Sequence, residues 1–168
     1  WSFNASAGFY HQLPPITALS FRDAEGCLAN KDLDYMRVIS TAVGADWKFR
    51  ARPFIGPEGL YKQFMDIPLS LETGVPLTCT GADYGSIGEE MLVSSASGRA
   101  YGVELLVRWL IPDKLSLVGS ATLYKSEYKS AKDADYIPSA WDNRFILNVS
   151  GVYDLPKYWS IGMKVSAI

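Results

Sequence analysis

The stretch Tyr101-Gly-Val-Glu-Leu-Leu-Val-Arg-Trp-Leu-Ile111 indicates the fold class, because its apolar residues recur at every second position. Tyr, Val, Leu, Val, Trp and Ile occupy the odd positions, while Gly, Glu and Arg share the even positions with two leucines. Successive side chains of a β-strand point to opposite faces of the sheet. We therefore predict a strand with one apolar face and one mixed face that carries charge.

Six further stretches are predicted as strands, and in five of them the apolar residues again recur at odd positions. They are Trp1–Phe9, Ile39–Phe49, Phe54–Met65, Leu115–Leu123, Phe145–Tyr153 and Trp159–Ala167. The stretch from Phe54 is the least regular, and Pro57 lacks the amide hydrogen that a strand ladder uses, so we expect a β-bulge there. The sequence thus predicts seven strands.

The predicted connections alternate between short and long. The short ones are Arg50–Pro53, Pro112–Lys114 and Asp154–Tyr158, and the long ones are Leu13–Tyr35, about Asp66–Ser97, and Glu127–Asp142. Short turns at one end and long loops at the other are typical of outer-membrane barrels. The predicted fold class is therefore all-β, an antiparallel up-and-down transmembrane β-barrel segment.

Three features favour a membrane barrel over a soluble sheet, which also alternates. About ten residues at ~3.3 Å each, in a strand tilted by ~40°, span the roughly 25 Å apolar band of a barrel. The opposite face is rich in Ser, Asn and Thr rather than Lys and Glu, which suits a barrel lumen. The third feature is a predicted pair of aromatic girdles at the membrane interfaces, formed at one end by Trp1, Trp47, Trp109 and Trp159 and at the other by Phe9, Tyr61, Tyr101 and Phe145. The alternative is four core tryptophans in a β-sandwich.

The number of predicted strands indicates whether these residues form a whole barrel. Seven is odd, whereas single-chain bacterial barrels have even numbers of strands. The first and last predicted strands also run in the same direction, so they cannot close as an antiparallel pair. We expect residues 1–168 to be a partial barrel domain, with the remaining strands outside this chain.

Four segments, taken in order, resemble TonB-dependent outer-membrane receptors, particularly those of Bacteroides-type bacteria. They are Glu58-Gly-Leu-Tyr-Lys-Gln-Phe-Met-Asp-Ile-Pro68, Gly81-Ala-Asp-Tyr-Gly-Ser-Ile-Gly-Glu-Glu90, Gly98-Arg-Ala-Tyr-Gly-Val-Glu-Leu-Leu106 and Ile137-Pro-Ser-Ala-Trp-Asp-Asn-Arg-Phe145. They resemble successive strands and loops from the later part of that family's barrel, and the resemblance covers most of the chain.

The resemblance implies a 22-stranded barrel with an N-terminal plug, which this chain lacks. It also implies import of a scarce nutrient, such as a metal chelate, a cofactor or an oligosaccharide. The implied partners are outer-membrane lipid, the small nutrient, the TonB energy-coupling complex acting through the plug, and in some relatives a surface lipoprotein. The implied location is the outer membrane of a Gram-negative bacterium.

Composition and motifs exclude other classes. The net charge of −2 offers no basic patch for nucleic acid. Cys27 and Cys79 are too few for a disulfide framework, and they are either paired across loops or free. His11 is the only histidine, and no G-x-S-x-G elbow is present, so we expect neither an enzyme, nor a metal site, nor a cofactor.

Ligand contacts are expected in the long loops and on the upper lumen face. The candidates are Tyr84, Glu89, Glu90, Tyr136, Trp141, Asp142 and Arg144. For Asp142 and Arg144, the favoured interpretation is that they anchor the base of a loop. A second set is predicted as lumen-facing charges that pair with one another or with the plug: Asp46, Lys48, Glu104, Arg108 and Lys164.

Two other functions remain open from the sequence. One is a small outer-membrane barrel with a structural or adhesive role, against which the odd strand count argues. The other is a soluble β-sandwich binding module.

Overall fold

Strands make up most of the chain in the computed structural model, which describes residues 1–48, 53–80 and 88–168. The long strands are β1 (Ser2–Gln12), β2 (Met36–Lys48), β3 (Pro53–Ser70), β4 (Leu92–Ile111), β5 (Leu115–Lys129), β7 (Phe145–Leu155) and β8 (Trp159–Ala167). The short elements are helix α1 (Ile16–Leu19), the 3-10 turn η1 (Leu77–Cys79) and strand β6 (Ile137–Pro138). Each strand predicted from the alternation is present. No helix in the described part of the chain is long and apolar enough to cross a membrane.

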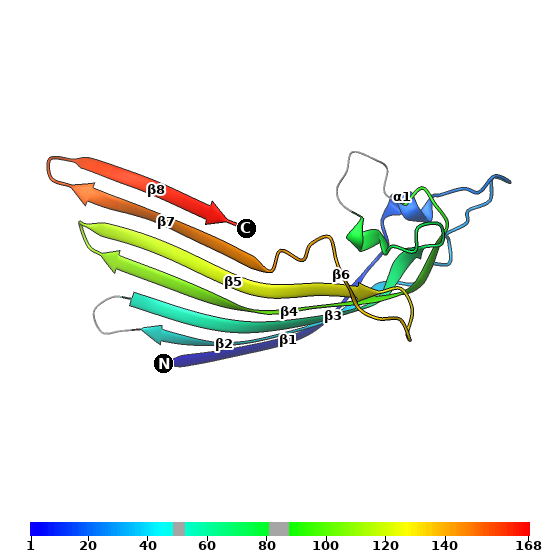
Figure 1. Cartoon of the computed structure of the whole chain (residues 1–168), viewed down its shortest axis with the longest axis horizontal. Helices are drawn as coiled ribbons and strands as arrows, with labels where there is room; N and C mark the ends of the chain where they lie inside the picture. Colours follow the sequence, from blue (N-terminus) through cyan, green and yellow to red (C-terminus); the bar gives the residue numbers. More distant parts are fainter. Residues whose placement is uncertain (49–52, 81–87) are drawn as a thin grey trace.

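The strands form one sheet in which every long strand pairs with its neighbours in sequence. The order is β1-β2-β3-β4-β5-β7-β8, all pairs are antiparallel, and β6 adds to β5 (Figure 1). The described short connections lie at one end of the sheet, and α1, η1 and the long loops lie at the other (Figure 1). We call these the short-turn end and the long-loop end.

Apart from the register shift between Phe64 and Pro68 and the short strand β6, the register places odd-numbered strand residues on one face. Phe9 pairs with Ile39, Tyr61 with Tyr101, and Val103 with Leu123, odd with odd in each case. Because paired residues share a face, the apolar faces of successive strands join into one continuous surface. We call it the apolar face, and the opposite, even-numbered surface the polar face.

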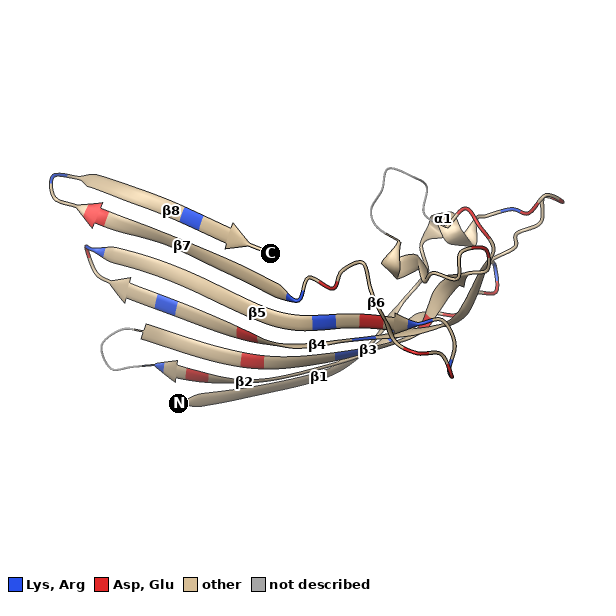
Figure 2. Cartoon of the chain, in the orientation of Figure 1, with Lys and Arg blue, Asp and Glu red and all other residues tan. Residues whose placement is uncertain are grey.

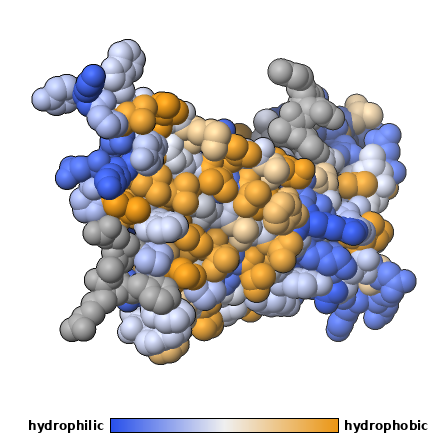
Figure 3. All heavy atoms as spheres, turned by 60° about the vertical axis from the view of Figure 1, so that its left-hand side comes forward, coloured by the Kyte–Doolittle hydropathy of each residue, from blue (hydrophilic) through white to orange (hydrophobic). Residues whose placement is uncertain are grey.

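The middle of the sheet has no protein core. The buried hydrophobic residues in the described chain, which include Ala18, Ile67, Leu77, Leu92 and Ala96, all lie toward the long-loop end. Large apolar side chains along the strands are instead exposed, among them Phe3, Val43, Val103, Leu123, Ile161 and Met163. Figure 3 shows apolar residues across the middle of the sheet with polar residues at both ends. Charged residues gather at the two ends as well, with fewer along the strands (Figure 2).

Several strands extend further toward the long-loop end than the alternation predicts. β3 continues to Ser70 and β4 begins at Leu92, so the loop between them is shorter than the predicted Asp66–Ser97. β5 continues to Lys129, beyond the predicted Leu123. The β5 extension, 124–129, is largely polar and lacks the apolar alternation that marks a strand. The extensions of β3 and β4 instead carry apolar residues that are buried at the long-loop end, among them Ile67, Leu69 and Leu92. All three extensions pair through their backbones. The β7–β8 connection is also shorter than predicted, because Asp154 and Leu155 belong to β7.

The bulge expected at Pro57 is wrong. Pro57 pairs with Leu105 in an unbroken register, and the register shift lies instead between Phe64 and Pro68. Asp66 adopts a positive φ of 56° there, and its carboxylate pairs with Arg37 on the neighbouring strand β2. An extra residue in a left-handed conformation increases the local bend of a strand. The bulge therefore lies toward the long-loop end of the sheet and not in its middle.

One buried asparagine joins the long loops at the top of the sheet. Asn30 is 2% exposed, and its amide nitrogen donates to the carbonyl oxygens of Ala18 (3.0 Å) and Glu90 (2.8 Å). Its amide oxygen accepts from the backbone nitrogen of Leu92 at 2.9 Å. Asn30 thus connects the loop after β1 with the loop before β4, although the two are about sixty residues apart in sequence.

We expect Asn30→Ala to loosen these loops while the strands stay paired. The substitution leaves buried backbone groups without partners, which costs about 1–3 kcal/mol each at sites shielded from water. Hydrogen exchange should rise at residues 16–35 and 88–92 and stay unchanged in β7 and β8. Asn143→Ala, at an exposed loop asparagine, is the control. Equal exchange in both variants would contradict the role assigned to Asn30.

Candidate functional site

A cavity of about 240 Å³ lies on the polar face at the long-loop end. The strand residues that line it are mostly even-numbered: Phe64, Gly98, Ser126 and Tyr128, together with Ile67 and Glu127. The loop residues that line it are Thr78, Cys79, Ser139 and Trp141. Gly98 keeps this cavity open, since a Cβ added there would approach the carbonyl oxygen of Glu127 to 3.2 Å. The loop residues Thr78, Cys79, Ser139 and Trp141 therefore fold over the polar face at this end.

Trp141 and Asp142 are fixed at this cavity by hydrogen bonds. The Trp141 indole nitrogen donates to the carbonyl oxygen of Thr78 at 3.0 Å, while half of its surface stays exposed. Asp142 Oδ1 accepts from the backbone nitrogen of Ser126 at 2.8 Å, and Asp142 Oδ2 lies 3.6 Å from Arg144 Nε. Asp142 therefore connects the base of this loop to β5 through the Ser126 backbone nitrogen. Arg144 is mostly exposed, so its long ion pair adds little.

Tyr136 belongs to a different place, on the apolar face. Its ring lies 3.9 Å from the Arg99 guanidinium carbon and 5.3 Å from Lys129 Nζ. Arg99 Nε and Nη2 both donate to Glu127 Oε2, at 2.9 and 2.8 Å, and Lys125 pairs with Glu127 Oε1. The structure therefore does not bring Tyr136 together with Trp141. The sequence analysis missed this Arg99–Lys125–Glu127 cluster, although Arg99, Lys125 and Glu127 share the odd-numbered parity of the apolar face.

Of the remaining ligand candidates, Glu89 and Glu90 lie neither at the cavity beside Trp141 nor beside Arg99. Glu90 has a structural role, since its carboxylate accepts from the Ser70 hydroxyl and its carbonyl accepts from Asn30. Glu89 is exposed in the loop before β4. Tyr84 lies outside the described residues. A ligand role for each of these residues stays a prediction.

The charges predicted to face the lumen lie on the polar face, as their even numbers require. Asp46 accepts a hydrogen bond from the Ser2 hydroxyl at 3.3 Å, and the Arg108 guanidinium lies 6.0 Å from the Phe54 ring centre. Within the described residues, no ion pair joins Asp46, Lys48, Glu104, Arg108 and Lys164. Glu104 instead pairs in register with Glu58, which places two like charges side by side. The expected mutual pairing is therefore not seen, and pairing with a plug stays a prediction.

The four predicted girdle tryptophans are all exposed at the short-turn end of the apolar face, and none belongs to a core. Trp1 stacks on Trp47, with ring centres 4.6 Å apart. Trp47 is in register, through Ile55, with Val107, so Trp109 lies two residues closer to the short-turn end. Trp109 is in register with Met163, so Trp159 lies four residues closer again. The row thus shifts steadily toward the short-turn end along the strand order.

The second aromatic row shifts in the same direction. Phe9 is in register with Gln63, and Tyr61 lies two residues nearer the short-turn end. Tyr61 pairs directly with Tyr101, and Tyr101 pairs with Lys125 on β5. Phe145 pairs with Leu123, which lies two residues nearer the short-turn end of β5 than Lys125 does. Phe9, Tyr61 and Phe145 are exposed and Tyr101 is half-buried.

The chemistry available at the long-loop cavity is that of binding. Trp141 offers an aromatic face, and Ser139 and Ser126 offer hydroxyls that are 2.8 Å apart. Cys79 is free and partly buried, and burial raises the pKa of its thiol, which weakens it as a nucleophile. Cys27 is also free, and it is exposed. Among the described residues, no group of three His, Cys, Asp or Glu side chains could hold a metal ion.

Comparison with known proteins shows the fold. No family model matches the chain, and no curated protein matches it. Among solved structures, the chain is similar to the FrpB iron transporter from Neisseria meningitidis (F3-3 variant), with a TM-score of 0.61 and 13% sequence identity over 96% of this chain and 24% of that one. The fold is a segment of an up-and-down β-barrel. The chain spans about a quarter of the length of that transporter.

We expect Cys27 to react with a maleimide faster than Cys79 at neutral pH. The thiolate is the form of cysteine that reacts with a maleimide. Because burial raises the pKa of the Cys79 thiol, a smaller fraction of Cys79 is thiolate at neutral pH. The labelling rate of Cys79 should still rise as the pH passes its ordinary pKa of 9.0. Mass spectrometry of Cys27→Ser and Cys79→Ser separates the two sites. Faster labelling of Cys79 at neutral pH would contradict the burial that raises its pKa.

Proposed function

We propose that this chain forms part of the membrane-spanning wall of an outer-membrane transporter of the TonB-dependent receptor type. The observation that carries the proposal is the continuous apolar face, which no part of the described chain covers. A soluble sheet hides such a face against a second layer, whereas the described residues form one layer. Hydrocarbon lipid is the environment in which an apolar face of this extent is stable.

The two aromatic rows support the membrane placement. The tryptophan row shifts by six residues over six strand steps, which corresponds to a tilt of about 35° at ~3.3 Å per residue and ~4.8 Å between strands. Phe9 to Phe145 gives about 30° by the same reasoning. Barrel strands tilt by ~35–45°, so each row would run nearly level in a barrel.

The distance between the rows supports the same placement. Trp1 and Phe9 are eight residues apart on one strand, as are Tyr101 and Trp109 on another. Eight residues span ~26 Å along a strand and ~22 Å in height at ~35° tilt, close to the ~25 Å apolar band of an outer-membrane barrel. Both rows would then lie at the two membrane interfaces, where amphipathic rings are favoured.

The loop geometry supports the assignment of the polar face to the lumen. Thr78, Cys79 and Trp141 cover the polar face at the long-loop end, as loops that narrow the entrance of a barrel would. We propose that the complete barrel has about 22 strands and holds a plug, against which Glu58 and Glu104 would find positive partners. The ligand contacts would lie at Trp141 and its cavity.

The transported nutrient is a metal chelate, a cofactor or an oligosaccharide, and the energy comes from the TonB complex acting through the plug. The similar structure is that of an iron transporter, which supports transport as the class of function. A surface lipoprotein partner is part of the same proposal, as is location in the outer membrane of a Gram-negative bacterium.

The tryptophans should report the membrane interface directly. We expect single-tryptophan variants that retain Trp1, Trp47, Trp109 or Trp159 to be quenched by phospholipids brominated near the headgroup. A variant that retains only Trp141 is the matched control, because this side chain lies in a loop of the long-loop end. The measurement is fluorescence of the complete gene product in bilayers.

The expected order is strong quenching for the four girdle positions and weak quenching for Trp141. Quenching of Trp109 that is no stronger than that of Trp141 would mean that the apolar face does not meet lipid. The membrane assignment would then fail.

Transport should depend on both the gene and the energy supply. We expect a deletion strain to lose uptake of one limiting nutrient among the three classes, and an uncoupler of the inner membrane to abolish uptake in the parent strain. The measurement is accumulation of the labelled nutrient, with complementation by the intact gene as control. Unchanged uptake of all three classes would refute the transporter proposal.

A further inference from the structure

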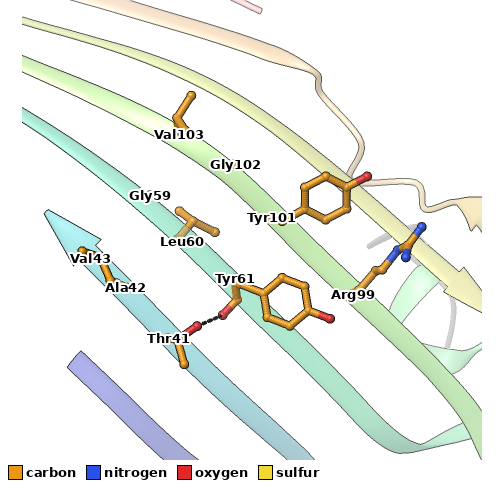
Figure 4. Close-up of a pocket in the computed structure, with 10 residues that line it drawn as sticks. All are labelled: Thr41, Ala42, Val43, Gly59, Leu60, Tyr61, Arg99, Tyr101, Gly102 and Val103. Carbon is orange, nitrogen blue, oxygen red and sulfur yellow. Dashed lines mark hydrogen bonds between the residues drawn. The ribbon is translucent and has the colours of Figure 1, made fainter. Parts of the chain in front are cut away.

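A groove of about 580 Å³ lies on the apolar face across β2, β3 and β4 (Figure 4). Most residues that line it are odd-numbered, among them Thr41, Val43, Gly59, Tyr61, Tyr101 and Val103. Gly59 lies between Val43 and Val103 in the register, so the floor drops where a side chain is missing. The groove therefore opens on the surface that faces lipid in the proposed function.

The hydroxyls of Thr41 and Tyr61 already have protein partners. The Thr41 hydroxyl donates to the carbonyl oxygen of Tyr61 at 3.4 Å (Figure 4). The Tyr61 hydroxyl donates to Gln63 Oε1 at 2.8 Å. Tyr61 and Tyr101 both extend toward Arg99, so their rings form a wall and their hydroxyls lie at the polar end (Figure 4). What remains between them is apolar and suits a hydrocarbon chain.

The long-loop end of the groove carries positive charge. Arg99 lines it, with its guanidinium carbon 5.6 Å from the Tyr101 ring centre and 3.9 Å from that of Tyr136. Arg99 and Lys125 share the one carboxylate of Glu127, so the three groups carry a net charge of +1. Lys129 adds a second positive charge beside Tyr136, whereas the nearby Arg37 is neutralised by Asp66.

An apolar groove that ends in a partly satisfied cationic cluster complements an anionic amphiphile. We propose that this groove binds a phosphorylated lipid of the membrane leaflet on the long-loop side. One acyl chain lies over Gly59 between Tyr61 and Val103, and the phosphate contacts Arg99 and Lys125. Guanidinium and ammonium groups form charge-assisted hydrogen bonds with phosphate, and Arg99 Nη1 has no protein partner within the described residues. This inference rests on the proposed membrane function.

The chain offers a clean variant for the acyl part of the site. A Cβ at Gly59 would meet no heavy atom nearer than 3.9 Å, so Gly59→Val fills the groove without a clash. Gly119→Val is the matched control, because Gly119 is also a mid-strand glycine on the apolar face, and its Cβ would lie 3.8 Å from its neighbours. Valine is favoured in strands, so neither change should unfold the sheet.

The phosphate part is tested by Arg99→Gln and Lys125→Gln, with Lys62→Gln on the polar face of β3 as control. Arg99 and Lys125 are replaced one at a time, because the Glu127 carboxylate is only 6% exposed and needs a cationic partner. In each variant, the cation that remains still pairs with Glu127. The complete gene product is reconstituted in bilayers with dioleoyl phosphatidic acid or dioleoyl phosphatidylcholine. Native mass spectrometry then counts the lipids that stay bound.

We expect wild type, Gly119→Val and Lys62→Gln to retain phosphatidic acid in preference to phosphatidylcholine. Gly59→Val should retain about tenfold less of either lipid, since it displaces one or two acyl methylenes. Each charge variant should lose about threefold of the preference for phosphatidic acid, as expected for one exposed ionic contact. Equal retention of the two lipids by wild type, or no effect of Gly59→Val, would overturn the inference.

Flotation of the same samples with liposomes separates this inference from the proposed function. A protein that floats with the bilayer but shows no lipid preference refutes only the groove site. A protein that does not float refutes both.

Discussion

Backbone hydrogen bonding between neighbouring strands is the constraint on which this structure depends. The middle of the sheet has no buried core, so the strands are held by their ladders and by the side-chain pairs on each face. Each ladder between long strands is antiparallel, and most run without a register shift. Because paired residues are both odd-numbered or both even-numbered in these ladders, the odd-numbered residues share one face of the sheet. Every property of the two faces follows from that pairing.

The apolar face and the polar face therefore have separate chemistries. On the polar face, loop residues close over a small cavity at Trp141, and charges such as Glu58 and Glu104 stand side by side. On the apolar face, two aromatic rows border a hydrophobic band, and a groove over Gly59 leads to Arg99. A single strand serves both, because neighbouring residues point to opposite sides. In the proposed transporter, one surface meets the nutrient and the other meets lipid.

The candidate site was predictable only in part. Trp141 and Asp142 could be placed at a loop base because the Trp-Asp-Asn-Arg run immediately precedes a recognisable strand. Tyr136 is only five residues from Trp141, yet β6 pairs with β5 and directs Tyr136 toward Arg99 on the other face. The Arg99–Lys125–Glu127 cluster was missed because Arg99 lies on β4 and meets Lys125 and Glu127 only through the pairing of β4 with β5. Glu90 is a predicted ligand contact, and its hydrogen bonds with Asn30 and Ser70 also connect the loops, which no local pattern indicates.

The sequence by itself determined the strand positions, the face to which each residue belongs and the end at which the long loops lie. It could do so because a period of two is a local property of neighbouring residues. The tertiary structure alone decided where the strands end, where the bulge lies and which charges meet. Those features depend on pairing between residues far apart in the chain, such as Arg37 with Asp66 or Asn30 with Glu90. No local pattern encodes such partners, because each residue's own neighbours are the same whichever strand lies beside it.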